Sequence, residues 1–281
     1  TPTPPMSYGR EYDKILRPIG AVTAAVIAAA VIYGAVNVVA HTPAAVWTSL
    51  LAQTPHMLKA LLYDYGRVAA VSSLAMAVAV TLGYYLATRH KVERIVAPAV
   101  QVFAAYPAPV YFPIIFSATY PLLYGALGYY ANELYVILLG FISTFYYVFY
   151  SFWMGLKAMP HEVWELMDNL RLSYWKRMRH VIIPAAMPYL IAGLSSTINS
   201  AWGGLAIGEY WPDIVAGRTL EVHNGLMRLI VLATNSGDIA LASWASLIFG
   251  IVVVLFSVLF TKRLMDLARG KYIVEEAIYA A

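Results

Sequence analysis

Long, uninterrupted apolar stretches are the feature that most constrains this chain. A helix needs about 20 consecutive apolar residues to cross the hydrocarbon core of a membrane, and only helices and closed barrels satisfy their backbone groups there. Barrel strands alternate apolar and polar residues, whereas these stretches are continuous. The sequence therefore predicts an all-α, polytopic membrane protein with six transmembrane helices, at about residues 18–40, 66–88, 95–120, 134–156, 189–207 and 239–260.

The charge content agrees with a fold embedded in lipid. Charged residues make up 12% of the chain, about half of the ~25% that is usual in soluble domains. The net charge of +4 does not indicate nucleic acid, because the basic residues flank the apolar stretches. The chain has no cysteine, and its six histidines show no HExxH pattern or short ligand spacing, so no metal site is expected. The sequence does not group a serine, a histidine and an acid in one region, so no catalytic triad of an enzyme is indicated.

The connecting segments are less uniform than the apolar stretches. Prolines in the third stretch are expected to kink or break its helix, and they are Pro98, Pro107, Pro109 and Pro113. Residues 41–65 mix apolar and polar side chains, which favours an interfacial helix broken near Pro55. A loop is expected over residues 121–133, and a longer loop that includes a short helix follows residue 207.

Basic residues are distributed unequally between the two sides that six crossings define. The side that carries both termini holds 15 of the 19 Lys and Arg residues, and the other side holds Lys59, Arg67, Arg218 and Arg228. Because cytoplasmic loops are enriched in Lys and Arg, both termini are expected in the cytoplasm of a cell-membrane protein. The expected organisation is a cytoplasmic lead (1–17), a first transmembrane helix (18–40), an extracytoplasmic interfacial segment (41–65), a core (66–265) and a cytoplasmic tail (266–281).

One polar segment, Pro160–Pro188, interrupts the apolar pattern on the cytoplasmic side. Apolar residues at helical spacing predict a short amphipathic helix that begins at Pro160, and they are Val163, Leu166, Met167 and Leu170. A second short helix is expected after Ser173, which can act as its N-cap. From the pattern alone, this segment either binds a partner protein or lies on anionic lipid.

Small polar residues within the apolar stretches are candidates for lining a pathway. Such side chains either pack helices together or line a route for an anion, to which hydroxyl groups donate hydrogen bonds without trapping its charge. Glu209, at the end of the fifth stretch, is either a functional acid or an acid that reaches the lipid headgroups. The pathway candidates are Ser72, Ser143, Thr144, Ser196, Asn199, Ser200 and Glu209.

Several motifs resemble those of permease subunits of binding-protein-dependent ABC importers. Glu165-Leu166-Met167 stands where the Glu-Ala-Ala of the family's coupling loop lies, and VIIPAAMP (181–188) is similar to its proline-rich ending. Three further sets of residues resemble the family in other spans: Gly66-Arg67-Val68, the pair Pro107 and Pro113, and Ala201-Trp202…Gly208-Glu209. The closing VLFSVLFTKRLMDLARGKY resembles the branch that imports nitrate, sulfonates and taurine. The resemblance implies a type I permease core with a coupling loop at 157–188.

This resemblance also implies which residues couple the spans to an ATPase: Glu162, Glu165, Asp168, Arg171, Ser173 and Pro184. At Arg171 the chain departs from the family, which has glycine six residues after the motif Glu. Glycine permits a left-handed turn that arginine adopts only at a cost. Either the turn has another geometry or the coupling loop is partly degenerate.

The implied function is the transmembrane subunit of an ATP-driven importer. The chain has no GxxxxGK[ST] phosphate loop, so ATP and magnesium are expected in partner ATP-binding subunits. Further implied partners are a second permease subunit, identical or paralogous, and an extracytoplasmic substrate-binding protein. The expected substrate is a small oxyanion such as nitrate, sulfonate or taurine. A non-transporting permease-like scaffold and an ion-gradient-driven secondary transporter remain as alternatives, although no internal repeat supports the latter.

Overall fold

The computed structural model describes residues 8–272, and the chain divides into two compact units after Ala52. The first unit contains α1 (Tyr8–His41) and the start of α2 (Ala44–Thr88), which continues into the second unit. Among the described residues, six helices are long and apolar enough to cross a membrane, as predicted: Arg17–His41, Ala44–Thr88, Ala108–Leu127, Tyr130–Lys157, Tyr174–Gly208 and Ile239–Leu267.

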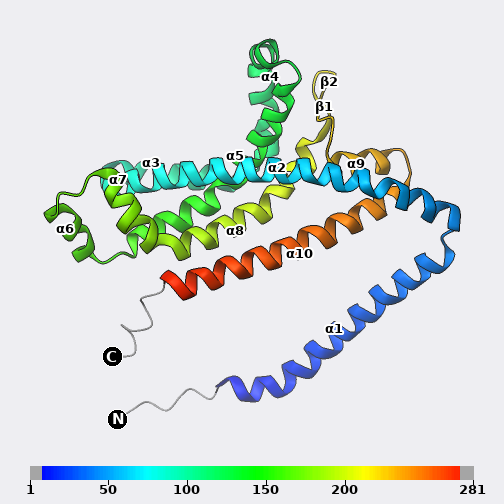
Figure 1. Cartoon of the computed structure of the whole chain (residues 1–281), viewed down its shortest axis with the longest axis horizontal. Coiled ribbons are helices and arrows are strands. Elements are labelled where there is room, and N and C mark those ends of the chain that lie inside the picture. The colour runs from blue at the N-terminus through cyan, green and yellow to red at the C-terminus, as the bar shows by residue number, and fades with distance from the viewer. Residues whose placement is uncertain (1–7, 273–281) are drawn as a thin grey trace. The chain divides into compact units, whose positions relative to one another are not determined.

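Within the second unit, α5 (Tyr130–Lys157) and α8 (Ile183–Gly208) form the closest helix pair, with α10 (Ile239–Tyr272) packed against α8. Glycines allow this approach: a Cβ at Gly204 would lie 2.8 Å from the Gly140 Cα, and one at Gly193 would lie 2.7 Å from the Val148 Cα. Small residues at such crossings let helix backbones approach in membranes. In Figure 1, α2, α5 and α8 run along one another.

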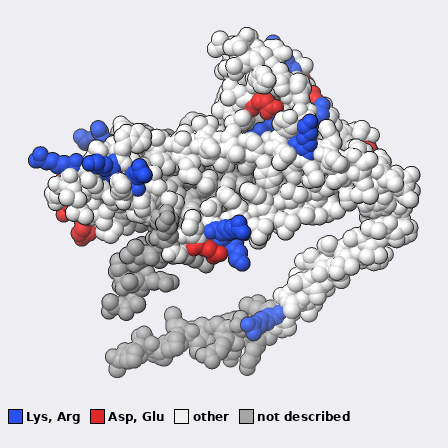
Figure 2. Space-filling model, viewed as in Figure 1, with Lys and Arg blue, Asp and Glu red and all other residues white. Residues whose placement is uncertain are grey.

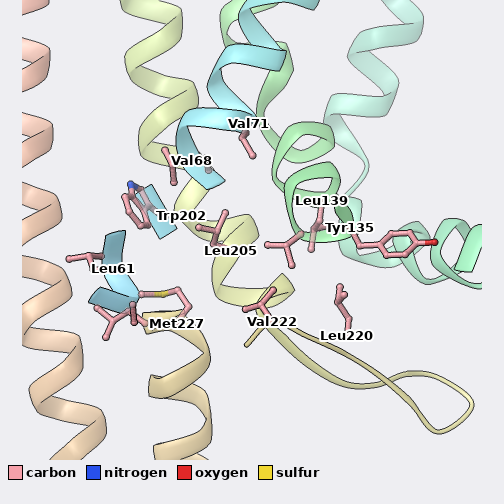
Figure 3. Packing of buried hydrophobic residues seen from close by; sticks show 14 of the residues in the cluster. Leu61, Val68, Val71, Tyr135, Leu139, Trp202, Leu205, Leu220, Val222 and Met227 are labelled. Carbon is pink, nitrogen blue, oxygen red and sulfur yellow. The ribbon is translucent and has the colours of Figure 1, made fainter. Parts of the chain in front are cut away.

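Two groups of buried side chains lie toward opposite ends of this helix bundle. Figure 3 shows the first group, where α2, α5 and α8 meet the segment after α8; its labelled members are Leu61, Val68, Val71, Tyr135, Leu139, Trp202, Leu205, Leu220, Val222 and Met227. The second group joins the other ends of α2, α5 and α8 to the polar segment through Leu86, Phe152, Leu156, Met167 and Ile182. Each end of the bundle is therefore anchored separately.

The prediction of one membrane-crossing helix over residues 95–120 is wrong, because two helices share this range. The chain forms α3 (His90–Ala105) and α4 (Ala108–Leu127), which projects away from the bundle in Figure 1. The break confirms the expected effect of the prolines: Tyr106 is extended (φ −87°, ψ 122°), the conformation that a following proline favours. Pro98 and Pro113 remain inside helices.

Two other expected interruptions are also wrong. The helix α2 continues through Pro55, because its next turns are fixed by the buried side chains of Met57, Ala60 and Leu61. The predicted loop 121–133 is largely helical: α4 extends to Leu127, and Gly128, at φ 57°, makes the turn toward α5.

The segment after α8 contains the expected short helix, α9 (Leu226–Asn235), and a hairpin that was not predicted. Strands β1 (Tyr210–Val215) and β2 (Arg218–Glu221) pair antiparallel, with Trp211 opposite Leu220. The turn uses Ala216 and Gly217 at positive φ, a conformation that two-residue hairpin turns require. This hairpin is the only sheet among the described residues.

Candidate functional site

The polar segment forms one separate helix and a second that joins α8. Helix α6 (His161–Asn169) confirms the first prediction, with Pro160 as its N-cap rather than its first residue. The second, α7 (Tyr174–Arg177), does not end as expected: a π-helical turn (Met178–Ile182) leads directly into α8. Pro184 lies at the start of α8, directly after this π-helical turn.

The turn between α6 and α7 is a Schellman motif with arginine in the position usual for glycine. The Leu172 N–H donates to the Met167 carbonyl at 3.1 Å, and the Arg171 N–H donates to the Asp168 carbonyl at 2.9 Å, the bonding pattern that defines this helix end. Arg171 has φ 47°. Of the two alternatives for Arg171, a different turn geometry is therefore wrong, because Arg171 adopts the left-handed conformation itself.

Arg177 holds this turn, although the sequence did not single it out. Its Nε donates to the Leu172 carbonyl at 2.8 Å, and its Nη2 lies 2.7 Å from Asp168 Oδ1. A cation at a helix C-terminus is favourable because it faces the negative end of the helix dipole. Ser173 occupies the N-cap position of α7 but makes no side-chain capping bond with the described residues. The turn between α6 and α7 is held by Arg177 instead.

The outward face of α6 combines acids with apolar side chains. Glu162 is exposed, and Glu165 pairs with His161 at 3.2 Å on the surface. Met167 is buried, whereas Leu166 and Leu170 are 56% and 60% exposed. The predicted apolar stripe is therefore divided between an anchored face and a free one, which is the composition expected of a protein-docking surface.

A buried acid fixes the base of the polar segment. Glu93, at the start of α3, lies 2.8 Å from the Nζ of Lys157 at the end of α5, and it pairs with His90 at 3.0 Å. The indole N–H of Trp153 donates to it at 3.0 Å. Burial raises the pKa of Glu93, but the bonds to Lys157 and His90 outweigh burial and lower it overall. The last residue of α5 before the polar segment is thereby tied to α3.

Two of the predicted pathway residues, Ser143 and Ser200, line one cavity of about 350 Å³ between α5, α8 and the α3–α4 turn. Tyr106, Tyr146 and Tyr147 add hydroxyl groups, and of the described residues that line the cavity none carries a charge. Ser143 donates its hydroxyl hydrogen to the Leu139 carbonyl at 2.7 Å. The hydroxyls of Tyr146 and Ser200 interact with that of Tyr147, so the polar groups of the cavity form a connected set of hydroxyls.

The other predicted pathway residues lie elsewhere. Ser72 lines a different cavity, between α2, α8 and α10, and its buried hydroxyl has no partner among the described residues. Thr144 is buried and bonds to the Gly140 carbonyl, and the exposed Ser196 bonds to the Ala192 carbonyl. Asn199 accepts a hydrogen bond from Ser257 of α10 at 2.7 Å. The structure thus does not join all seven candidates into one lining.

Glu209 is fully buried at the end of α8, so the alternative of an acid that reaches the lipid headgroups does not fit. It belongs to a group that we call the Arg67 cluster: Asp64, Arg67, Glu133 and Glu209. The guanidinium of Arg67 lies 3.1 Å from Asp64 and 3.0 Å from Glu209, and it binds both oxygens of Glu133 at 2.7 and 2.8 Å. Burial is the main cause that raises the pKa of Glu209.

Sequence reasoning missed Asp64, Arg67 and Glu133 as functional candidates. A signal was present, since ionisable residues next to or within apolar stretches mark functional sites. The tertiary partners could not be assigned, because Arg67 and Glu209 are 142 positions apart.

These features define a multi-pass α-helical membrane protein with an anchored polar helix at one end of its bundle and a charge cluster at the other. The chain belongs to the family of binding-protein-dependent transport system inner membrane components, whose model matches residues 79–268. The matched region includes the polar segment and Glu209, and the resemblance inferred from the sequence is confirmed.

The chain is similar to three curated permease proteins. It is 29% identical over 148 residues to the bicarbonate transport system permease protein CmpB of Synechocystis, covering 53% of this chain and 49% of that protein. It is 24% identical over 177 residues to the nitrate import permease protein NrtB of Synechococcus elongatus, covering 63% and 57%. A 78-residue match, 27% identical and covering 28% of each chain, relates it to the putative aliphatic sulfonates transport permease protein SsuC of Bacillus subtilis. The matches thus span at most 57% of these relatives' lengths.

Proposed function

We propose that this chain is the transmembrane permease subunit of an ATP-driven importer for a small oxyanion. The observation that carries the proposal is that α6 is held rigidly at the end of the bundle while one of its faces remains exposed. One face is anchored by Met167, its end is fixed by Arg177, and its outer face presents Glu165, Leu166 and Leu170. A short helix held in this way suits docking to a separate ATP-binding subunit, which would bind ATP and magnesium.

The anchoring of α6 supports a mechanical role for the segment. Met167 belongs to the same buried group as Phe152 and Leu156 of α5 and Ile182 before α8. Packed interiors transmit displacement because they have few voids. Movement of the docked ATPase would therefore reach α5 and α8, the two helices that border the cavity with Ser143 and Ser200.

The chemistry of this cavity supports a small anion as the solute. Its polar groups are hydroxyls, and no lysine or arginine of the described chain lines it, so an anion would be stabilised in passage without being held. The three relatives are named for bicarbonate, nitrate and aliphatic sulfonates, all of them oxyanions. Nitrate, bicarbonate and sulfonates, taurine included, are therefore the first solutes to test.

The proposed orientation follows from the basic side chains. In Figure 2 a group of them lies at the end of the bundle that carries α6, and others lie near the hairpin. Because four basic residues follow α6 closely in the sequence, namely Arg171, Lys176, Arg177 and Arg179, this end is assigned to the cytoplasm. The hairpin and α9 then face the extracytoplasmic side, where a substrate-binding protein would dock. A second permease subunit, identical or paralogous, would complete the pathway.

The experiment that tests this function is reconstitution in liposomes with the ATP-binding subunit and the binding protein. ATP-dependent uptake of one of the oxyanions is expected, and Glu165→Lys should lower substrate-stimulated ATP hydrolysis while the complex still assembles. Uptake driven by an ion gradient without ATP would instead establish a secondary transporter. If no ATP-binding subunit co-purifies and neither form of uptake occurs, the chain is a scaffold.

A further inference from the structure

The Arg67 cluster joins four parts of the second unit that are distant in sequence. Arg67 itself lies on α2, Glu133 on α5 and Glu209 at the end of α8. The Nη2 of Arg67 also donates to the Asn224 carbonyl, just before α9, at 2.7 Å. Arg67 is 4% exposed, and Asp64 and Glu209 are fully buried. The cluster is thus a separate buried network at the end of the bundle opposite to α6.

Two acids of the cluster cap the first turn of α9. The Leu226 N–H donates to Asp64 Oδ2 at 2.9 Å, and the Arg228 N–H donates to Glu209 Oε2 at 3.1 Å. The first N–H groups of a helix have no partner within the helix, and acids are favoured at its positive end. The N-cap residue of α9, Gly225, has no side chain to offer. Acids from α2 and α8 therefore cap a helix that lies elsewhere in the sequence.

Gly225 brings the start of α9 into direct contact with the cluster. A Cβ at this position would overlap Glu209 Oε2 and would lie 3.2 Å from Arg67 Nη1. Its backbone is extended, at φ 179°, so any residue could adopt the conformation. The lack of space, and not the backbone, requires glycine here.

The hairpin is attached to the same region by further bonds. The Val222 N–H donates to the Glu209 carbonyl at 3.1 Å, and Asn132 of α5 donates to the Glu221 carbonyl at 2.9 Å. Leu220 and Val222 are fully buried in the first group of core side chains (Figure 3). The whole connection from residue 209 to 235 is thus fixed to α2, α5 and α8.

Arginine suits the centre of this arrangement better than lysine. Its planar guanidinium presents five N–H groups in a fixed fork, and here Nε and Nη2 bind Glu133 while Nη1 binds Asp64 and Glu209. Among the described residues, Arg67 is the one cation that forms a salt bridge with any of these three acids. Without it, the acids that cap α9 would be buried with no opposite charge.

We propose that Arg67 is a positioning residue that holds α9 and the hairpin in register with α2, α5 and α8, so that the connection 209–235 moves with these helices as one body. The consequence for transport rests on the proposed function: a binding protein that docks on the hairpin would act on the transmembrane helices through Arg67. The local role of Arg67 does not depend on transport and is tested first.

The chain contains no cysteine, so single cysteines report local opening cleanly. In Leu226→Cys, the thiol replaces a fully buried side chain at the start of α9, and slow labelling by a maleimide is expected. Adding Arg67→Met should raise the labelling rate at least about tenfold, because the capping acids lose their cation and α9 opens locally. Leu86→Cys, buried at the opposite end of the bundle, should remain protected. Arg218→Met is the matched control, since Arg218 lies over the Tyr120 ring, outside the cluster.

Unchanged labelling of the Leu226→Cys thiol in the Arg67→Met background would overturn the proposal. If Arg67→Met exposes the thiols of both Leu226→Cys and Leu86→Cys, the protein has unfolded, and Glu133→Gln then decides. This variant keeps Arg67 but weakens its bidentate partner. A smaller rise confined to the thiol at position 226 supports the proposal, and no rise overturns it.

The transport consequence is tested in the reconstituted complex. Arg67→Met should retain basal ATP hydrolysis and lose most of its stimulation by the loaded binding protein, and Arg67→Lys should recover part of it. Full stimulation in Arg67→Met would overturn the coupling role. If the wild-type complex itself hydrolyses no ATP, the proposed function fails, whereas the labelling result still decides the positioning role of Arg67.

Discussion

Arg67 and Glu93 are both buried charges that tie several helices together, but their surroundings differ. Arg67 is one cation among three carboxylates, of which Asp64 and Glu209 are fully buried. Glu93 is one carboxylate with basic partners, and those partners reach solvent: the side chains of Lys157 and His90 are 43% and 74% exposed.

The difference shows that the solvent exposure of the charged partners decides how much the Arg67 cluster and the Glu93 group contribute to stability. An exposed partner that loses its counter-charge is solvated by water, so breaking the pair costs little. A buried carboxylate that loses its cation keeps its full desolvation penalty. The Arg67 cluster is therefore expected to control stability, and the Glu93 group to adjust the position of Lys157 next to α6.

The largest expected effect is that of Arg67→Met. It leaves buried carboxylates without a cation and should lower the free energy of unfolding by about 3–5 kcal/mol. Denaturant unfolding in detergent, followed by tryptophan fluorescence, measures the change. Arg218→Met, outside the cluster, should change it by less than about 0.5 kcal/mol. Equal effects of the two variants would remove the contrast between the two centres.

Gly225→Ala should have the next largest effect. Its Cβ would overlap the Glu209 carboxylate, and relief of such a clash typically costs about 1–3 kcal/mol. Gly203→Ala is the matched control, because a Cβ there meets nothing within 4 Å. The same unfolding measurement applies. If Gly225→Ala leaves the free energy of unfolding unchanged, the side chains of the cluster can move aside at little cost and do not hold the start of α9.

The pH dependence should distinguish the two centres by sign. Burial raises the pKa of Glu209 well above its usual 4.5, so the folded state binds a proton more tightly than the unfolded chain. Its contribution to stability is full below pH 4.5 and is lost as the pH rises through the raised value. Glu209→Gln, which mimics the protonated form, should weaken this decline. Unfolding free energies measured from about pH 5 to 9 test it, and an unchanged slope in the variant would contradict the assignment.

The sequence predicted what depends on local pattern. The number of apolar spans and the presence of α6 follow from length and period, although the third span is Ala108–Leu127 and not 95–120. Family resemblance located the turn at Arg171. Prolines nevertheless gave opposite results: Pro107 ends a helix, whereas α2 continues through Pro55. Packing decides between them, because the turn after Pro55 is fixed by buried side chains. Local pattern carries no information on such packing.

The candidate sites show the same limit. Ser143 and Ser200 were predicted and share a cavity, because small polar residues in apolar stretches are visible in sequence. Arg177 and the partners of Arg67 were missed, since Arg177 acts on the preceding turn, through Leu172 and Asp168, and the partners of Arg67 lie as far as 66 and 142 positions away. The residues that hold the candidate sites in place were thus harder to predict than those within them.

The smallest expected effect concerns the Glu93 group. Lys157→Met leaves Glu93 with two remaining partners, His90 and the indole N–H of Trp153, so a loss of about 1 kcal/mol or less is expected at neutral pH. The overall pKa of Glu93 is lowered, burial being outweighed by the bonds to Lys157 and His90. A lowered pKa contributes stability above pH 4.5 that is lost as the pH falls through the folded value.

The difference in stability between wild type and Lys157→Met should therefore shrink below pH 4.5, where protonated Glu93 no longer attracts the ammonium group. Unfolding curves from about pH 3 to 7 measure it. A difference that persists at the acid end would show that Lys157 acts through its aliphatic packing. The contrast with Arg67 would then be one of packing and not of charge.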